Sequence, residues 1–147
     1  MAQPSRPPAA PTAAFYAQLR SEACRIRSCV SASRAFLADH GAPAHAAHRA
    51  ELVLAEVLNN IAEHAYCADA PGWIGLALRL QPGGVEVCVC DRGIAMPQKR
   101  PPEAALPDPA GLPEGGFGWF LIHELSQELV YRHEGGLNRL TFRLPLR

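Results

Sequence analysis

In residues 73–81 a large aliphatic side chain occupies every second position, and this pattern constrains the fold more than any other in the chain. Its apolar positions are Ile74, Leu76, Leu78 and Leu80. Because successive side chains of a β-strand point to opposite faces, the pattern predicts a strand with one buried face. Residues 82–84 read Pro-Gly-Gly, which predicts a turn, and Val85–Asp91 alternates again. The two segments therefore predict a β-hairpin.

Two stretches before the hairpin have helical spacing. From about residue 15 to His40 apolar residues recur at intervals of three to four, and Gly41 and Pro43 end that helix. A second helix is predicted over about 44–67. Its apolar stripe contains Leu54, Leu58, Ile61 and Ala65, and its opposite arc contains Glu56, Asn59, Asn60 and Glu63.

The remaining segments complete the pattern. Residues 1–14 are rich in Pro and Ala, which predicts a disordered N-terminal leader. Residues 94–114 contain six prolines and no period, as expected of a functional lid or a disordered segment. A helix is predicted from about Gly118 to Gln127, and two strands near 129–133 and over 139–146, with a Gly-rich turn between them.

The order of helix, helix, hairpin, loop, helix and hairpin predicts the fold class. Helices gathered on one face of a mostly antiparallel sheet make a two-layer α/β sandwich. A chain of 147 residues is long enough for one such domain, which we expect over 15–147. The other face of the sheet would be partly exposed or covered by a partner.

Composition excludes several classes of function. The chain has 14 basic and 14 acidic residues, so it has no net positive charge that would attract nucleic acid or an anionic membrane. No apolar run approaches the length of about 20 residues that a membrane helix needs. Its five cysteines do not form the paired Cys-x-x-Cys spacing that is typical of zinc sites. Free thiols in that number are typical of a reducing compartment, so we expect a cytoplasmic protein.

Glu56 and Asn60 lie one turn apart on the second predicted helix, so their side chains project to the same place. An Asn oxygen is a suitable single ligand for nucleotide-bound Mg²⁺, and a neighbouring carboxylate can accept a proton from an attacking hydroxyl. The alternative is that both residues only solvate the polar face of an amphipathic helix. His64, at the end of the same helix, is ambiguous between a site residue and a capping residue.

Asp91 ends the second strand on the same face as its buried valines. A carboxylate there needs a donor to offset its desolvation, and the exocyclic amine of adenine is one. Gly93 would let the backbone approach a flat base. The alternative is an acidic turn residue after a strand.

Gly115, Gly116 and Gly118 precede or begin the next predicted helix, whose free N–H groups could bind phosphate. The alternative is a flexible hinge. No Gly-Lys-Ser/Thr follows, which excludes a P-loop, and no strand precedes the glycines, which excludes a Rossmann turn.

Taken in order, these segments resemble the motifs of one superfamily. The run from Glu51 to Tyr66, with Glu56, Asn60 and His64, looks like the N-box of the gyrase/histidine-kinase/MutL (GHKL) ATPases. Cys90-Asp91-Arg-Gly93 is similar to their first glycine box, Gly115–Ile122 to the second, and Asn138–Pro145 to the closing strand. Within this superfamily the short chain and the His-Ala-Tyr after the N-box Asn most resemble the bacterial anti-sigma factor serine kinases.

The resemblance implies the Bergerat ATP-binding fold with ATP and Mg²⁺ as ligands. By position, Glu56 would be the catalytic base and Asn60 the magnesium ligand. Asp91 and Gly93 would hold adenine, and Gly116 and Gly118 the phosphates. Residues 94–114 would form the ATP lid, from which Arg100, or less readily Lys99, would reach a phosphate.

The resemblance also implies partners: an anti-anti-sigma protein of the STAS type as the phosphorylated substrate, a sigma factor to be sequestered, and a second copy of the chain in a homodimer. A non-catalytic anti-sigma binding module is the alternative. A third interpretation, the catalytic domain of a two-component histidine kinase, is disfavoured because no phosphoacceptor helix pair is evident. One departure from the family pattern is Ile94-Ala95, where another glycine is usual.

Overall fold

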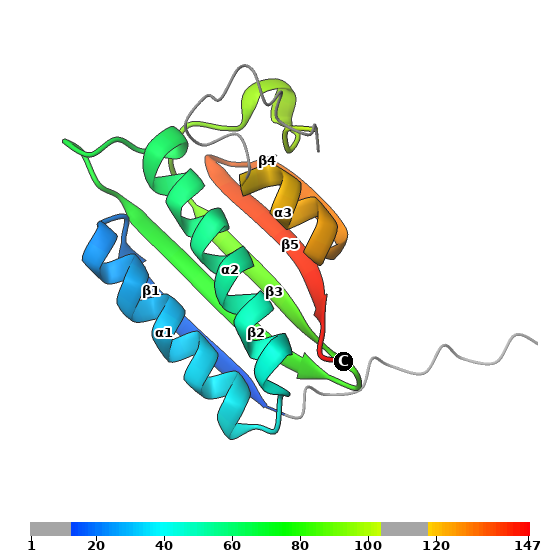
Figure 1. Ribbon diagram of the computed structural model, residues 1–147. Helices are drawn as coiled ribbons and strands as arrows, with labels where there is room; N and C mark the ends of the chain where they lie inside the picture. The colour runs from blue at the N-terminus through cyan, green and yellow to red at the C-terminus, as the bar shows by residue number, and fades with distance from the viewer. Residues whose placement is uncertain (1–12, 104–117) are drawn as a thin grey trace, which may run out of the picture.

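The computed structural model describes residues 13–103 and 118–147, and in it one antiparallel sheet carries helices on a single face (Figure 1). The five strands are ordered β1-β2-β3-β5-β4. They are β1 (Ala14–Arg20), β2 (Trp73–Gln81), β3 (Gly84–Asp91), β4 (Gln127–Glu134) and β5 (Leu137–Pro145). The helices are α1 (Ala23–Asp39), α2 (Ala44–Asn60) and α3 (Gly118–Leu125). The predicted two-layer α/β sandwich is confirmed.

The core lies between α2 and the alternating inner rows of the central strands. The buried residues of these rows are Ile74, Leu76, Leu78 and Leu80 of β2, Val85, Val87 and Val89 of β3, and Leu140, Phe142 and Leu144 of β5. From α2, Val53, Leu54, Val57 and Leu58 pack against them. The hairpin of β2 and β3 and the apolar stripe of the second helix were therefore predicted correctly.

The N-terminal part of the domain differs from the prediction, which placed a helix from about residue 15. Residues Ala14–Arg20 form the edge strand β1, and the helix begins at Ala23, so the predicted helix start at about residue 15 was wrong. Leu19, assigned to the helix from its spacing, instead pairs with Ile74 of β2. Burial alternates along β1, so pairing with β2 outweighs the local helical spacing.

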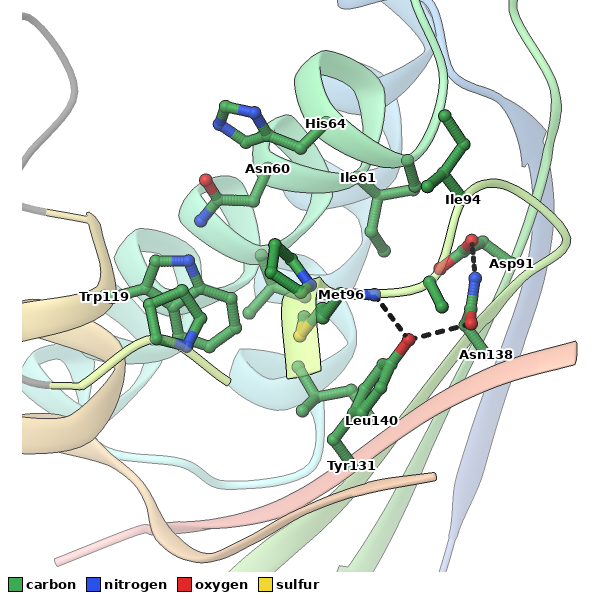
Figure 2. Close-up of a pocket in the computed structure, with 15 residues that line it drawn as sticks. Asn60, Ile61, His64, Asp91, Ile94, Met96, Trp119, Tyr131, Asn138 and Leu140 are labelled. Carbon is green, nitrogen blue, oxygen red and sulfur yellow. Dashed lines mark hydrogen bonds between the residues drawn. The ribbon is translucent and has the colours of Figure 1, made fainter. Parts of the chain in front are cut away.

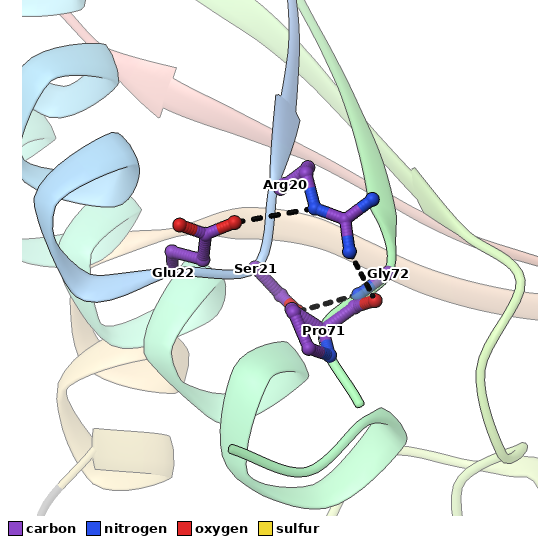
Figure 3. A network of polar contacts seen from close by, with 5 residues as sticks. All are labelled: Arg20, Ser21, Glu22, Pro71 and Gly72. Atoms are coloured by element: carbon purple, nitrogen blue, oxygen red, sulfur yellow. Dashed lines mark hydrogen bonds and ion pairs between the residues drawn. The ribbon is translucent and has the colours of Figure 1, made fainter. Parts of the chain in front are cut away.

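A small polar network fixes the turn from β1 into α1 (Figure 3). The N–H of Ser21 donates to the carbonyl of Gly72 at 2.9 Å, and the N–H of Gly72 donates to Oγ of Ser21 at 2.9 Å. Arg20 donates to the carbonyl of Pro71 and pairs with Glu22, each at 3.2 Å. These contacts tie the edge strand to the entry of β2.

The second helix changes its winding directly after Asn60. Residues Ile61–Ala65 form one π-helical turn, η1, and the predicted helix to 67 therefore ends at 65. Tyr66 is extended, and its hydroxyl donates to the carbonyl of Trp73 and accepts from the N–H of Arg92, both at 2.8 Å. The phenol thus ties the helix end to β2 and to the end of β3. A π-turn inside a helix is frequently a functional feature.

The face of the sheet away from the helices is partly open, as expected. Tyr16 is 63% exposed and Val130 is 43% exposed. Cys88 and Cys90 lie half-buried on this face with their sulfurs 3.9 Å apart. Burial and the neighbouring thiol raise the pKa of Cys88 to about 11, so this thiol stays protonated near neutral pH.

Parts of the predicted organisation lie outside the described residues. Residues 1–12 of the predicted leader and 104–114 of the predicted lid are among them, so both stay predictions. Of the predicted lid, the described portion holds a short 3₁₀ turn, η2 (Pro97–Lys99). Among the described helices, none has the length and apolar character of a membrane span.

The central position of α2 predicts where the fold is sensitive to substitution. Leu54 is fully buried between α2 and the sheet, whereas Leu52 on the same helix is 39% exposed. Leu54→Ala should lower the free energy of unfolding by about 2–5 kcal/mol, because it leaves a cavity in the core. Urea unfolding of this variant and of Leu52→Ala, as the matched control, would measure the difference. A loss of similar size in both variants would contradict this view of the core.

Candidate functional site

A cavity of about 400 Å³ lies between the end of α2, the ends of β3, β4 and β5, and the segment after β3 (Figure 2). Its volume is in the range of small-molecule sites, which are mostly apolar with a few placed polar groups. The polar side chains that line it are Asn60, His64, Asp91, Trp119, Tyr131 and Asn138. The apolar wall includes Val57, Ile61, Ile94, Met96 and Leu140.

Asp91 continues the buried inner row of β3, as predicted, and is only 6% exposed. Its Oδ1 accepts hydrogen bonds from the N–H of Gly93 at 2.9 Å and from Nδ2 of Asn138 at 2.8 Å. Burial raises the pKa of Asp91, while these two donors and the nearby His133 partly offset the rise. Among the described residues, no hydrogen bond reaches Oδ2, so the carboxylate keeps an acceptor for a ligand in the cavity.

Asn138 is a site residue that sequence reasoning missed, because the last strand was predicted to begin at Arg139. It pairs with Asp91 across β3 and β5 and is 2% exposed. Its Oδ1 accepts from the hydroxyl of Tyr131 at 2.8 Å and is 2.6 Å from Nδ1 of His133. A polar residue at an inner-row position of the final hairpin was the signal that could have found it.

Gly93 is required by close packing against the end of the helix. A Cβ at this position would lie 2.3 Å from the carbonyl oxygen of Ala65, the last residue of η1. The next residue, Ile94, donates its N–H to the same carbonyl at 2.8 Å. The close approach that only glycine permits is therefore to the π-turn. Contact of Gly93 with a base stays a prediction.

Glu56 and Asn60 lie together beside the first residue of α3. A Cβ added at Gly118 would be 2.5 Å from Oε2 of Glu56 and 3.5 Å from Nδ2 of Asn60. Gly118 thus lets the N-terminus of α3 approach both side chains. The structure brings together three of the predicted site residues from segments that are far apart in the sequence.

Two predicted phosphate contacts have no support from the described residues. Gly116 lies outside them, so its role stays a prediction. Arg100 is exposed, donates to Oε1 of Gln98 at 2.5 Å, and is not among the residues that line the cavity. The neighbouring Lys99 is also exposed. His64 does line the cavity, from the π-turn.

Asn60 would bind nucleotide-bound Mg²⁺ only through its amide oxygen, because an amide nitrogen donates hydrogen bonds and does not bind cations. Its Nδ2 is buried and has no hydrogen-bond partner in the described part of the chain, which is unusual for a buried amide. Within residues 13–103 and 118–147 no group of three or more His, Cys, Asp or Glu side chains could hold a metal alone.

Comparison with known proteins agrees with this geometry. The curated relatives include the "Serine-protein kinase RsbW" of Bacillus thuringiensis, 28% identical over 95 residues, which cover 61% of this chain and 59% of that protein. The protein of the same name from Halalkalibacterium halodurans is 29% identical over 92 residues, which cover 59% of this chain and 56% of the relative. The match therefore spans little more than half the length of these relatives.

Solved structures show the same fold. The RsbU and RsbW domains of a Mycobacterium tuberculosis protein match with a TM-score of 0.65 at 24% identity, over 92% of this chain and 33% of that one. The histidine kinase domain of a blue-light activated histidine kinase from Erythrobacter litoralis matches with a TM-score of 0.51 at 23% identity, over 84% of this chain and 60% of that one. At these identities the likeness concerns the fold.

The family itself follows from a match to nearly the whole domain. The family model described as "Histidine kinase-like ATPase domain" matches residues 19–144, a range that contains every wall of the cavity. The chain belongs to the histidine kinase-like ATPase domain family.

Proposed function

We propose that this protein is a serine kinase that uses Mg-ATP to phosphorylate an anti-anti-sigma protein of the STAS type. The observation that carries the proposal is the placement of Glu56, one turn from Asn60 and against Gly118 at the start of α3. A carboxylate beside the expected metal ligand and a helix N-terminus is suited to phosphoryl transfer to a hydroxyl, because it can orient that hydroxyl and accept its proton. The similarity to RsbW serine-protein kinases supports the same activity.

In this proposal one end of the cavity binds the adenine base and the other end binds the metal and the phosphates. Asp91 would accept a hydrogen bond from the exocyclic amine of adenine through its free Oδ2. Asn60 and the N-terminus of α3, where Gly118 and Gly116 lie in sequence, would hold the metal and phosphate end. Bound Mg²⁺ would neutralise charge on the phosphates. ATP binding is the coarser function that the family match already supports.

Glu56 would accept the proton of the attacking serine hydroxyl as the new bond between oxygen and phosphorus forms and ADP leaves. Because positioning and charge stabilisation supply most of the rate of phosphoryl transfer, Glu56 would also orient that hydroxyl. The partner serine must then approach the edge of the cavity beside Gly118.

The proposed partners are inferred from the similarity to the RsbW serine-protein kinases. An anti-anti-sigma protein would be the substrate, a sigma factor would be the sequestered partner, and a second copy of the chain would complete a homodimer. These partners and ATP would meet this protein in the cytoplasm.

The deciding experiment mixes the protein with Mg-ATP and candidate partners from its own operon, followed by mass spectrometry of each partner. A phosphoserine on a STAS-type partner is the expected result. Capture of a sigma factor without ATP and without phosphate transfer would instead favour a non-catalytic binding module.

Glu56→Gln tests the proposed base. Phosphate transfer should fall by about 10²–10⁴-fold, the usual contribution of a positioned general base. The dissociation constant for ATP should change little, because the amide keeps the shape of the side chain. Glu63→Gln, at an exposed position of the π-turn, removes a charge nearby and should leave transfer intact. If Glu56→Gln transfers phosphate at the normal rate, Glu56 is not the base.

Asn60→Ala tests the proposed metal ligand. Affinity for ATP should fall by roughly 10–100-fold in the presence of Mg²⁺, as for other substitutions that disturb a metal site. With EDTA present, the variant and the unmodified protein should bind ATP about equally. The matched control is Asn59→Ala, at the adjacent exposed position. An equal loss with and without Mg²⁺ would argue against a metal role.

Asp91→Asn should weaken ATP binding and yet stabilise the fold. The new amide can keep both hydrogen bonds to its Oδ1 while removing a buried charge. Since the pKa of Asp91 is raised in the folded state, ionisation opposes folding above that pKa, and the cost vanishes at low pH.

The variant should therefore gain about 0.5–2 kcal/mol of stability at pH 7, the usual size of a single stabilising substitution. This gain should disappear as the pH falls below the ordinary Asp pKa of about 3.9. Thermal unfolding at several pH values would measure it, with Asp69→Asn at an exposed site as the control. Lower stability of Asp91→Asn at pH 7 would contradict this electrostatic account.

A further inference from the structure

The amide of Asn138 uses its full hydrogen-bonding capacity, which fixes its orientation. Its Nδ2 donates to Oδ1 of Asp91 at 2.8 Å and to the carbonyl of Gly93 at 3.0 Å. Its Oδ1 accepts from the hydroxyl of Tyr131 at 2.8 Å and lies 2.6 Å from Nδ1 of His133. Because the carboxylate of Asp91 and the carbonyl of Gly93 can only accept, the amide nitrogen must face them, and the amide oxygen must face Tyr131.

The hydroxyl of Tyr131 also accepts the backbone N–H of Met96 at 2.9 Å. Met96 lies in the segment after β3, and this segment supplies one wall of the cavity through Ile94, Ala95, Met96 and Pro97. A continuous chain of hydrogen bonds therefore runs from Met96 through Tyr131 and Asn138 to Asp91, as Figure 2 shows. All four of these residues line the cavity.

The burial of this chain makes its partners costly to separate. Asn138 and Asp91 are 2% and 6% exposed, and Tyr131 is half-buried. Burial raises the pKa of the Tyr131 phenol, so it remains a donor at neutral pH. Loss of the Asn138 amide would remove one of the two donors to Oδ1 of Asp91, the amide donor to the Gly93 carbonyl and the acceptor of the Tyr131 hydroxyl proton. Such networks act as units rather than as separate bonds.

We propose that Asn138 and Tyr131 are positioning residues that couple recognition of the adenine amine by Asp91 to the placement of the cavity wall at Met96. This inference rests on the proposed ATP site and concerns how binding of the base at Asp91 affects the cavity wall at Met96. A base that occupies Oδ2 of Asp91 favours the arrangement in which Asn138 holds Oδ1. In the same arrangement Oδ1 of Asn138 holds the hydroxyl of Tyr131, and this hydroxyl holds the backbone N–H of Met96. Nucleotides that lack the amine would leave this wall less firmly held.

The test compares ATP with purine riboside triphosphate, which lacks the exocyclic amine. Fluorescence of Trp119, which lines the cavity, reports binding in a Trp73→Phe background. Hydrogen exchange of the Met96 amide reports the wall. The unmodified protein should prefer ATP by about 10–100-fold, the range for a hydrogen bond to a charged group. ATP should also protect the Met96 amide more than the analogue does.

Asn138→Leu should reduce the preference for ATP to about twofold or less and make the two ligands protect Met96 equally. A purely structural role would instead weaken both ligands by the same factor and leave their ratio unchanged, and that result would overturn the inference. Tyr131→Phe keeps the amide and the ring, and so carries the test if Asn138→Leu does not fold. It should speed Met96 exchange by at least about tenfold and lower the ATP preference.

Tyr16→Phe, at an exposed position of β1, is the matched control and should change neither readout. Normal Met96 exchange in Tyr131→Phe would overturn the inference while leaving ATP binding itself established. If the unmodified protein binds neither nucleotide, the proposed function fails, and the inference fails with it.

Discussion

The site depends on one buried carboxylate at the end of an otherwise apolar row. Asp91 follows Val85, Val87 and Val89 on the inner face of β3. A charge at such a position costs free energy unless hydrogen bonds compensate it. The chain supplies two donors to Oδ1, from Gly93 and Asn138, and keeps Oδ2 for a ligand. Oδ2 of Asp91 is therefore a free hydrogen-bond acceptor on a residue that is only 6% exposed.

The rest of the cavity is arranged around this carboxylate by close backbone contacts. The π-turn η1 places the carbonyl of Ala65 against Gly93 and Ile94. Gly118 lets the start of α3 reach Glu56 and Asn60. Each contact brings a segment from a distant part of the sequence to the end of α2. The contact with the backbone of Ala65 explains why position 93 is a glycine, independently of any direct contact with a nucleotide. At Gly118 the nearest atom is the flexible end of Glu56, so the packing there does not by itself require glycine.

Sequence patterns predicted the parts of the fold that follow a simple period. The alternation in β2 and β3 and the stripe of α2 were enough for the architecture, and they placed Asp91 on the inner face. The edge strand β1 was only weakly marked, because Leu19 fits a helical spacing as well as a strand and only pairing with Ile74 decides between them. The π-turn was also missed, since it depends on the carbonyl contacts of Ala65 rather than on a pattern.

The same contrast between local pattern and tertiary contact applies to the candidate site. The positions of Glu56, Asn60 and Asp91 could be predicted because each occupies a defined place in a helix or a strand, and their roles stay proposals. Asn138 and Tyr131 could not, because their importance comes from hydrogen bonds between β4, β5 and the segment after β3. Such bonds join residues that only the tertiary fold brings together.

Calorimetric titration of the unmodified protein with Mg-ATP and with Mg-GTP tests the central claim most directly. The carboxylate of Asp91 should accept the amine of adenine and be repelled by the oxygen that guanine carries at the same position. We therefore expect saturable binding of one ATP per chain and at least about tenfold weaker binding of GTP. Equal affinity for the two nucleotides, or no binding of ATP, would contradict the account.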